Sequence, residues 1–181
     1  MTPHDARAVL AAAEQIYSAQ DVERAIGRVA ADITRALAEQ NPLVLIVMSG
    51  AVVFAGQLLP RLTFPLDLDY LHLTRYANTT RGGELEWKTL PQQPVAGRVV
   101  LVIDDVLDEG HTLAEIRRHL LADGAAAVYS AVFADKDLGK PKPLAADFVG
   151  VKLPNRYVFG FGMDVRGAWR NLPAVYALKE E

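Results

Sequence analysis

Residues 99–113 read VVLVIDDVLDEGHTL, and this stretch decides the fold. Its first five residues are apolar, which is typical of a strand buried on both faces of a parallel sheet. Two acids and a short loop with one glycine follow, and the pattern from Thr112 predicts a helix over 112–122. A buried strand that leads through a glycine loop into a helix is the repeating unit of α/β proteins.

The rest of the chain continues this alternation. Apolar residues at three- and four-residue steps predict helices within 5–40, and a short helix is expected over 51–58. We therefore expect one α/β domain over residues 1–181, with a mainly parallel sheet flanked by helices. The predicted strands are 44–48, 64–73, 84–90, 98–105, 126–134, 148–151 and 157–161.

Composition narrows the class of protein. Residues are 51% hydrophobic and 23% charged, the formal net charge is -3, and there is no cysteine. Disulfides, cysteine-ligated zinc and a thiol nucleophile are thus excluded. The acidic balance argues against a nucleic-acid partner. The N-terminus has no basic start followed by an apolar run, so we expect a cytoplasmic protein without a secretory signal.

One uncharged segment, residues 43–59, approaches the length of a membrane span. Ser49, Gly50, Gly56 and Gln57 interrupt it. A buried strand, a glycine turn and a short helix explain the segment better, and no membrane partner is expected.

The acids and the glycine of residues 104–112 suggest a binding site. Ligands of open α/β sheets bind beyond the carboxyl ends of the strands, and a helix N-terminus suits a phosphate. Gly110 would let the backbone approach phosphate oxygens, and Thr112 would add a hydroxyl donor and cap the helix. Asp104 and Asp105 could accept hydrogen bonds from a sugar diol or interact with hydrated magnesium.

A ribose 5-phosphate pocket is the function that this pattern favours. An ordinary strand–turn–helix with a solvated acid pair is the alternative. The segment lacks the Gly-Lys-Ser/Thr of a nucleotide P-loop and the GxGxxG pattern of dinucleotide-binding proteins.

Residues 103–112, IDDVLDEGHT, resemble the motif with which purine phosphoribosyltransferases bind phosphoribosyl pyrophosphate (PRPP). The hypoxanthine-guanine branch is the most similar. The resemblance implies a type I phosphoribosyltransferase-like fold, with a flexible lid loop and a small hood of N- and C-terminal elements. It also implies Mg²⁺ as cofactor and a homo-oligomer, a dimer or a tetramer.

The resemblance assigns the PRPP site residue by residue. Asp104 and Asp105 hold the ribose hydroxyls and interact with the metal through water. Asp108 matches the carboxylate that faces the purine N7 and is the proposed catalytic proton shuttle. The loop that holds the 5-phosphate comprises Glu109, Gly110, His111 and Thr112.

Other segments match the family's remaining parts. Residues 48–51, MSGA, fall where the family has a loop that contacts pyrophosphate through a cis peptide, which assigns this role to Ser49 and Gly50. Arg75 and Tyr76, followed by the glycine-rich residues up to Gly83, resemble the lid. The remaining matches are Lys136 for the purine 6-oxo group, Tyr157 for stacking, Val158 for the exocyclic group, Asp164 as magnesium ligand and Arg170 for pyrophosphate.

Several of these residues have simpler interpretations when taken alone. Lys136 lies among Asp135, Asp137 and Lys140, as a solvated surface lysine would. His4, His72 and His119 lack metal-ligand spacing and are taken as structural, and Asp67 and Asp69 are given no chemistry. The family also usually has a basic residue at Ser49, Ser-Tyr at Arg75-Tyr76, and Lys and Thr at His111 and Glu109. These departures bear on the affinity for PRPP and pyrophosphate.

The predicted function is purine salvage. The chain would transfer the phosphoribosyl group of PRPP to a 6-oxopurine base, hypoxanthine or guanine, giving IMP or GMP and pyrophosphate. The alternatives are a xanthine-preferring transferase, a nucleic-acid-binding regulator on the same fold, and a nucleotide-binding scaffold without activity.

Overall fold

The computed structural model describes residues 1–75 and 85–179, and its centre is a six-stranded sheet. Five strands run parallel, and β4 pairs antiparallel with β3 at one edge. Val100 to Ile103 are fully buried, as predicted for the central strand. In spatial order the strands are β4 (Leu85–Thr89), β3 (Asp67–Arg75), β2 (Leu43–Met48), β5 (Val99–Leu107), β6 (Ala127–Lys136) and β7 (Phe148–Leu153).

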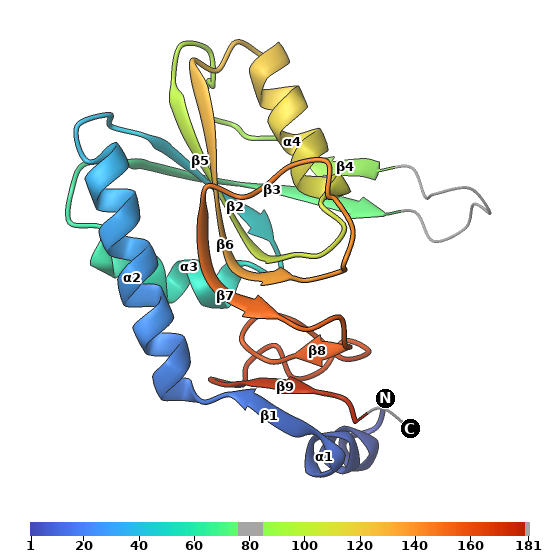
Figure 1. Ribbon diagram of the computed structural model, residues 1–181. Helices are drawn as coiled ribbons and strands as arrows, with labels where there is room; N and C mark the ends of the chain where they lie inside the picture. Colours follow the sequence, from blue (N-terminus) through green and yellow to red (C-terminus); the bar gives the residue numbers. More distant parts are fainter. Residues whose placement is uncertain (76–84, 180–181) are drawn as a thin grey trace.

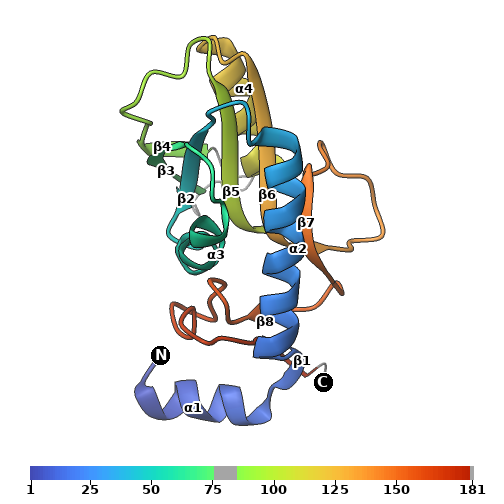
Figure 2. The same ribbon diagram turned by 90° about the vertical axis from the view of Figure 1, so that its left-hand side faces the viewer.

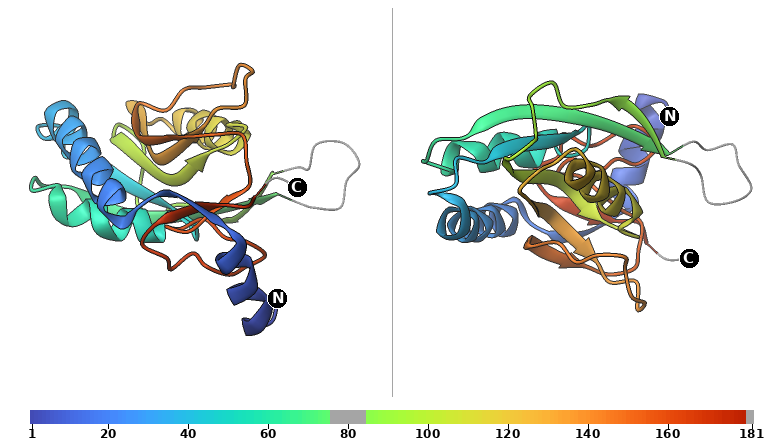
Figure 3. Two further views of the ribbon diagram at one scale, coloured as in Figure 1. Left: turned by 60° about the horizontal axis from the view of Figure 1, so that its bottom comes forward. Right: turned by 90° about the horizontal axis from the view of Figure 1, so that it is seen from above.

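Helices cover both faces of this sheet, as expected for an α/β fold. Helices α2 (Ala19–Leu37) and α3 (Val52–Leu58) lie on one face, and α4 (His111–Ala122) lies on the other (Figures 2 and 3). A 3₁₀ turn, η1 (Leu59–Arg61), continues α3. The apolar stripe predicted for α2 is buried, with Val22, Ile26 and Val29 at most 1% exposed.

A second, smaller sheet forms the expected hood. It joins β1 (Glu14–Tyr17), β9 (Val175–Ala177) and β8 (Val158–Phe159) in antiparallel order. Figure 1 shows it beyond the carboxyl ends of the central strands, with α1 (Pro3–Ala12) beside it. The indole nitrogen of Trp169 donates to the Ala6 carbonyl (2.7 Å), which ties α1 to the C-terminal segment.

The prediction of helices throughout residues 5–40 was wrong at one point. Strand β1 separates α1 from α2, and it pairs with β9. Ser18 and Asp21 form a capping box that starts α2 anew. The partner strand β9 lies at the other end of the chain and was not predicted, so the local sequence gave no reason to expect β1.

Two strand predictions also needed new bounds. Strand β3 begins at Asp67 rather than residue 64, after Pro65. The strand predicted over 157–161 shrinks to Val158–Phe159, because Gly160 and Phe161 have positive φ angles and turn the chain. The uncharged segment 43–59 folds as β2, a turn and α3. Within the described residues, no helix is long and apolar enough to cross a membrane.

The two capping boxes allow a matched test of how α2 supports the fold. Ser18→Ala removes the side-chain acceptor of the Asp21 N–H, and we expect a loss of about 1 kcal/mol in the free energy of unfolding. The control is Thr2→Ala at the equivalent cap of α1. Since α1 contributes no buried residue, we expect the control to cost only about a few tenths of a kcal/mol. Urea unfolding measures both, and equal losses would contradict the prediction.

Candidate active site

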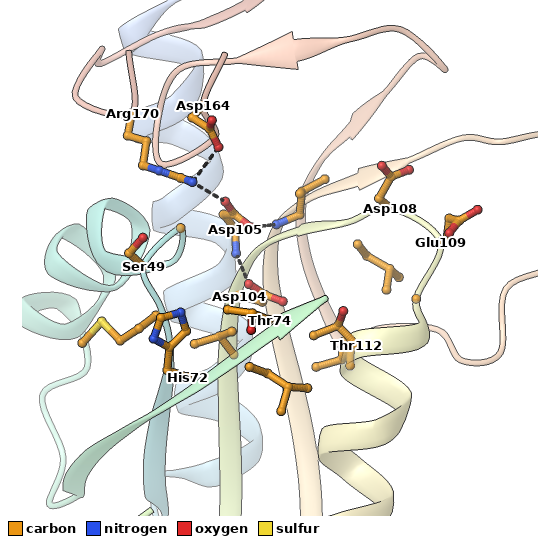
Figure 4. Close-up of a pocket in the computed structure, with 18 residues that line it drawn as sticks. Ser49, His72, Thr74, Asp104, Asp105, Asp108, Glu109, Thr112, Asp164 and Arg170 are labelled. Atoms are coloured by element: carbon orange, nitrogen blue, oxygen red, sulfur yellow. Dashed lines mark hydrogen bonds and ion pairs between the residues drawn. The ribbon is translucent and has the colours of Figure 1, made fainter. Parts of the chain in front are cut away.

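A cavity of about 420 Å³ lies between the carboxyl ends of the parallel strands and the hood. Figure 4 shows side chains from β3, β5, the loop before α4 and the hood converging on it. Its polar lining comprises Ser49, His72, Thr74, Asp104, Asp105, Asp108, Glu109, Thr112, Asp164 and Arg170.

The acid pair Asp104–Asp105 directly follows the fully buried residues 100–103 of β5. The Asp105 N–H donates to Asp104 Oδ1 (2.9 Å), and the Val106 N–H donates to Asp105 Oδ1 (2.8 Å). Burial raises the pKa of Asp104 well above its ordinary value, and the neighbouring Asp105 charge raises it further. Burial also raises the pKa of Asp105, although the Val106 N–H and the Arg170 charge act in the opposite direction. The two carboxylates therefore have less positive charge around them than their ionised forms would need.

The loop after β2 approaches this pair through glycine. The Met48–Ser49 peptide bond is cis, as the resemblance implied for this loop. A Cβ atom on Gly50 would overlap the carboxylate of Asp105. A Cβ atom on Gly162, whose φ is +98°, would in turn overlap the Gly50 carbonyl. Backbone from β2 and from the hood is thus packed directly on the acid pair.

Arg170 links the hood to the acids. Its Nη2 lies 2.5 Å from Asp164 Oδ1, and its Nη1 lies 3.9 Å from Asp105 Oδ2. Nη1 also donates to the Gly162 carbonyl (2.6 Å). The other oxygen of Asp164 accepts the Gly167 N–H (2.7 Å). Arg170 is 38% exposed, so this cation is open to a ligand from the cavity side.

The loop before α4 has the shape of an anion site. Gly110, with φ +84°, is the N-cap residue of α4, and Glu109, Gly110 and Thr112 line the cavity. The prediction that Thr112 caps the helix was wrong. Helix α4 begins at His111, and no side-chain hydrogen bond caps its N-terminus. The exposed His111 does not line the cavity. The backbone N–H groups at this helix end remain suited to a phosphate.

A second hollow, of about 250 Å³, adjoins the first. Lys136, Tyr157, Val158 and Met163 line it, and it shares Asp105, Val106, Asp108, Asp164 and Arg170 with the larger cavity. The Tyr157 side chain is exposed (52%) at its rim.

Lys136 and Asp108 form a pair at this second hollow. The Lys136 Nζ atom lies 3.2 Å from Asp108 Oδ2, and only 14% of the lysine side chain is exposed. The interpretation of Lys136 as a solvated surface lysine was therefore wrong. A half-buried lysine beside a carboxylate provides donors and an acceptor at adjacent positions.

The structure brings together most of the predicted site residues. The lid predicted from Tyr76 to Gly83 lies outside the described residues, and the Arg75 backbone ends β3. His72 and Thr74, which the sequence analysis gave no role in the site, line the large cavity. Because β3 extends beyond the end of its neighbour β2, its last residues reach the ligand edge of the sheet.

Carboxylates from β5 and the hood are the groups here that suit a hard cation. Within residues 1–75 and 85–179, no group of three or more His, Cys, Asp or Glu side chains is arranged to hold a metal ion. Magnesium commonly binds through one or two carboxylates together with substrate phosphates. Asp104, Asp105 and Asp164 fit that arrangement, since burial leaves the first two short of positive charge.

Comparison with known proteins gives consistent matches. Residues 12–166 match the family described as phosphoribosyl transferase domain. The chain is 33% identical to the hypoxanthine-guanine-xanthine phosphoribosyltransferase of Tritrichomonas foetus, over 91% of each chain. It is 31% identical to the hypoxanthine-guanine phosphoribosyltransferase of Streptococcus thermophilus, over 92% of this chain and 93% of the relative. A solved hypoxanthine phosphoribosyltransferase from Staphylococcus aureus has a TM-score of 0.84 at 27% identity, covering 92% of this chain and 91% of that one.

The burial of Asp104 predicts a stability that depends on pH. Between its ordinary pKa, near 3.8, and the raised pKa of the folded state, the folded chain binds a proton that the unfolded chain has released. Stability contributed by this group is therefore lost as the pH rises through that window. Asp104→Asn cannot ionise, and we expect it to be more stable than wild type by about 1 kcal/mol at neutral pH.

Calorimetry from about pH 4 to about pH 8 measures this difference. The advantage of Asp104→Asn should grow with pH and then level off. Asp32→Asn, at an aspartate of α2 that is 53% exposed, is the control and should show no such gain. A variant that is less stable than wild type at neutral pH would contradict the prediction.

Proposed function

The chain belongs to the phosphoribosyltransferase family, and from that premise we propose that it transfers the phosphoribosyl group of PRPP to hypoxanthine or guanine. The products are IMP or GMP and pyrophosphate. One observation carries the proposal: the Lys136–Asp108 pair lies in a hollow that opens into the cavity of the acid pair and the α4 N-terminus. A base and a sugar phosphate bound in these hollows would meet at their shared residues.

The ribose phosphate occupies the larger cavity in this proposal. The carboxylates of Asp104 and Asp105 accept hydrogen bonds from the ribose hydroxyls. The backbone of residues 109–112 and the hydroxyl of Thr112 hold the 5-phosphate at the N-terminus of α4. The exposed His111 contributes its backbone rather than its side chain.

Pyrophosphate binds between Ser49, Gly50 and Arg170. The backbone of the loop after β2 lies beside the acid pair, and Arg170 supplies the cationic counterpart for the leaving group. We propose that Mg²⁺ is held by Asp164, with Asp104 and Asp105 acting through water. When bound, this ion neutralises the charge of the departing pyrophosphate. Since Asp164 now pairs with Arg170, metal binding and release of that pair are coupled.

The base lies in the smaller hollow. Lys136 donates to the purine 6-oxo group, and Asp108 faces N7 on the same edge of the base. The exposed ring of Tyr157 offers a stacking surface, and the backbone of Val158 contacts the exocyclic group at C2.

The reaction is a displacement at the anomeric carbon. The C1–O bond to pyrophosphate breaks, and the purine N9 forms the new bond as positive charge develops on the ribose. Asp108 accepts the proton that the base loses. Most of the rate enhancement comes from positioning the two substrates and from compensating charge. A lid at Arg75, Tyr76 and the following residues would exclude water.

We further propose that residues 1–181 form a single catalytic domain that works in the cytoplasm as a homo-oligomer, a dimer or a tetramer. The family match over residues 12–166 supports one domain. Leu68 and Tyr70 lie two residues apart on β3 and are 49% and 40% exposed, which supports a contact with a second copy.

The base preference is tested by a screen of purified protein with PRPP and Mg²⁺. Hypoxanthine and guanine should each give the nucleotide. The kcat/KM for adenine should be at most about one part in 10⁴ of the kcat/KM for hypoxanthine. The T. foetus relative is named for xanthine as well, so xanthine is included in the screen. Product is measured by chromatography of the monophosphates. Absence of product with every base would leave a nucleotide-binding regulator as the better proposal.

Lys136→Gln tests whether Lys136 recognises the 6-oxo group of the base. An ammonium has three donors and no acceptor, so it pairs with a 6-oxo group and not with the donor side of an adenine amino group. The glutamine amide offers both a donor and an acceptor. The variant should therefore have a lower kcat/KM for hypoxanthine, and the difference in kcat/KM between hypoxanthine and adenine should become smaller. We expect a loss in kcat/KM for hypoxanthine of about 10-fold or more. Lys152→Gln, at a lysine of β7 that is 72% exposed, is the control. An unchanged base preference in Lys136→Gln would remove this role from Lys136.

A further inference from the structure

Lys142 is a largely buried lysine outside the proposed substrate contacts. It lies in the long connection between β6 and β7, and its side chain is 12% exposed. Its Nζ atom donates to three oxygens: the Leu107 carbonyl (2.7 Å), the Lys136 carbonyl (2.5 Å) and Asp135 Oδ1 (2.6 Å). These bonds use the full donor capacity of an ammonium group.

The three acceptors belong to the two strand ends that carry the base-reading pair. Leu107 is the last residue of β5 and directly precedes Asp108. Lys136 is the last residue of β6. Leu107 and Asp135 face each other at the final register position between these strands. Lys142 therefore links the ends of β5 and β6 next to Asp108 and Lys136.

The connection also lies against the phosphate loop. A Cβ atom on Gly110 would come within 3.3 Å of the Pro143 ring, the residue after Lys142. Asp108 thus lies between two points, Leu107 and Gly110, that the same connection contacts. Such an arrangement limits how far the Asp108 carboxylate can move relative to Lys136.

We propose that Lys142 is a positioning residue for the transferase reaction, which holds Asp108 and Lys136 at the spacing needed to read N7 and the 6-oxo group of one purine edge. This inference rests on the proposed function. Lys142 touches neither substrate in this role and acts through the backbone of the two residues that do. Asp135 assists by holding Lys142, and its own charge is shared with the Nζ atom of Lys152 (2.5 Å).

Lys152 provides a matched control. Both lysines pair with the Asp135 carboxylate, one on each oxygen. Lys152 is 72% exposed, however, and within the described residues its Nζ atom reaches the strand ends only through that carboxylate, with no bond to the Leu107 or Lys136 carbonyl. Removing Lys152 therefore removes a cation from Asp135 without loosening the ends of β5 and β6.

The experiment compares Lys142→Met with Lys152→Met. Lys142→Met should lower kcat/KM for hypoxanthine by about 10- to 100-fold, in part through a higher KM for hypoxanthine, while KM for PRPP stays within about twofold. The reason is that Lys142 bonds to the strand ends that carry the base contacts. Lys152→Met should leave both parameters near wild type. A loss of stability alone would reduce the amount of active enzyme, which lowers the apparent kcat but leaves both KM values unchanged, so a raised KM for hypoxanthine identifies misplacement of the base contacts.

Restoring the amine provides a second readout. The chain has no cysteine, so Lys142→Cys can be alkylated at a single site with 2-bromoethylamine in denaturant and then refolded. The resulting amine should recover the efficiency with hypoxanthine, whereas alkylation with iodoacetamide should not. If Lys142→Met does not fold, Asp135→Asn replaces it and should show a smaller defect of the same kind.

The outcomes separate this inference from the function on which it rests. A wild-type protein that forms no nucleotide overturns the proposed function, and the role of Lys142 falls with it. An active wild type together with unchanged hypoxanthine kinetics in Lys142→Met, or in Asp135→Asn if that variant is needed, overturns the role of Lys142 alone. A KM for PRPP that rises as much as the KM for hypoxanthine, an unchanged KM for hypoxanthine, or no recovery on restoring the amine also overturns it.

Discussion

The contact between the backbone of Gly50 and the carboxylate of Asp105 is the constraint on which the site depends. It fixes the end of β2 against the end of β5, and Gly162 of the hood packs on the Gly50 carbonyl from the other side. A side chain at either glycine would push these segments apart. The central sheet and the hood therefore meet at the acid pair through backbone alone, and the cavity forms around that meeting point.

This close packing has an energetic cost in the protein without ligand. Two neighbouring carboxylates are half-buried at the cavity, and this burial raises the pKa of both. Arg170 compensates only part of the charge, at 3.9 Å from Asp105, and it is shared with Asp164. Sugar hydroxyls and a hydrated cation would supply the missing donors and positive charge. The site is thus less stable than an apolar strand end would be, and that deficit favours ligand binding.

The sequence predicted the central sheet well because its signals are local. The continuous apolar run of β5 and the apolar stripe of α2 each indicate, from neighbouring residues alone, which side chains are buried. The hood strands β1 and β9 escaped prediction because each is short and finds its partner at the opposite end of the chain. Helix α4 starts one residue earlier than predicted, with Gly110 as its N-cap, so Thr112 lies inside the first turn and cannot be the N-cap residue.

The site residues were predicted to a similar extent, and by a different route. The acid pair and the phosphate loop follow from a strand–loop–helix pattern, but Lys136, Tyr157 and Arg170 were assigned from a family resemblance. His72, Thr74 and Lys142 were not assigned, because nothing in their own neighbourhood of the sequence marks them. His72 lies beside Met48 at the last register position of β2, and Thr74 reaches the cavity because β3 extends beyond β2. Lys142 is largely buried because its loop packs against two strand ends.

The residues shared by the two hollows explain why few side chains are needed for the transfer reaction. They share Asp105, Asp108, Asp164 and Arg170, so the residues that border the sugar phosphate also border the base. Asp105 lies near the end of β5, Asp108 directly follows that strand, and Lys136 comes from the adjacent strand. Their relative positions are set by the ladder between β5 and β6 and by the lysine that closes it. A rigid sheet edge, rather than a flexible loop, thereby sets the distance between the base and the anomeric carbon.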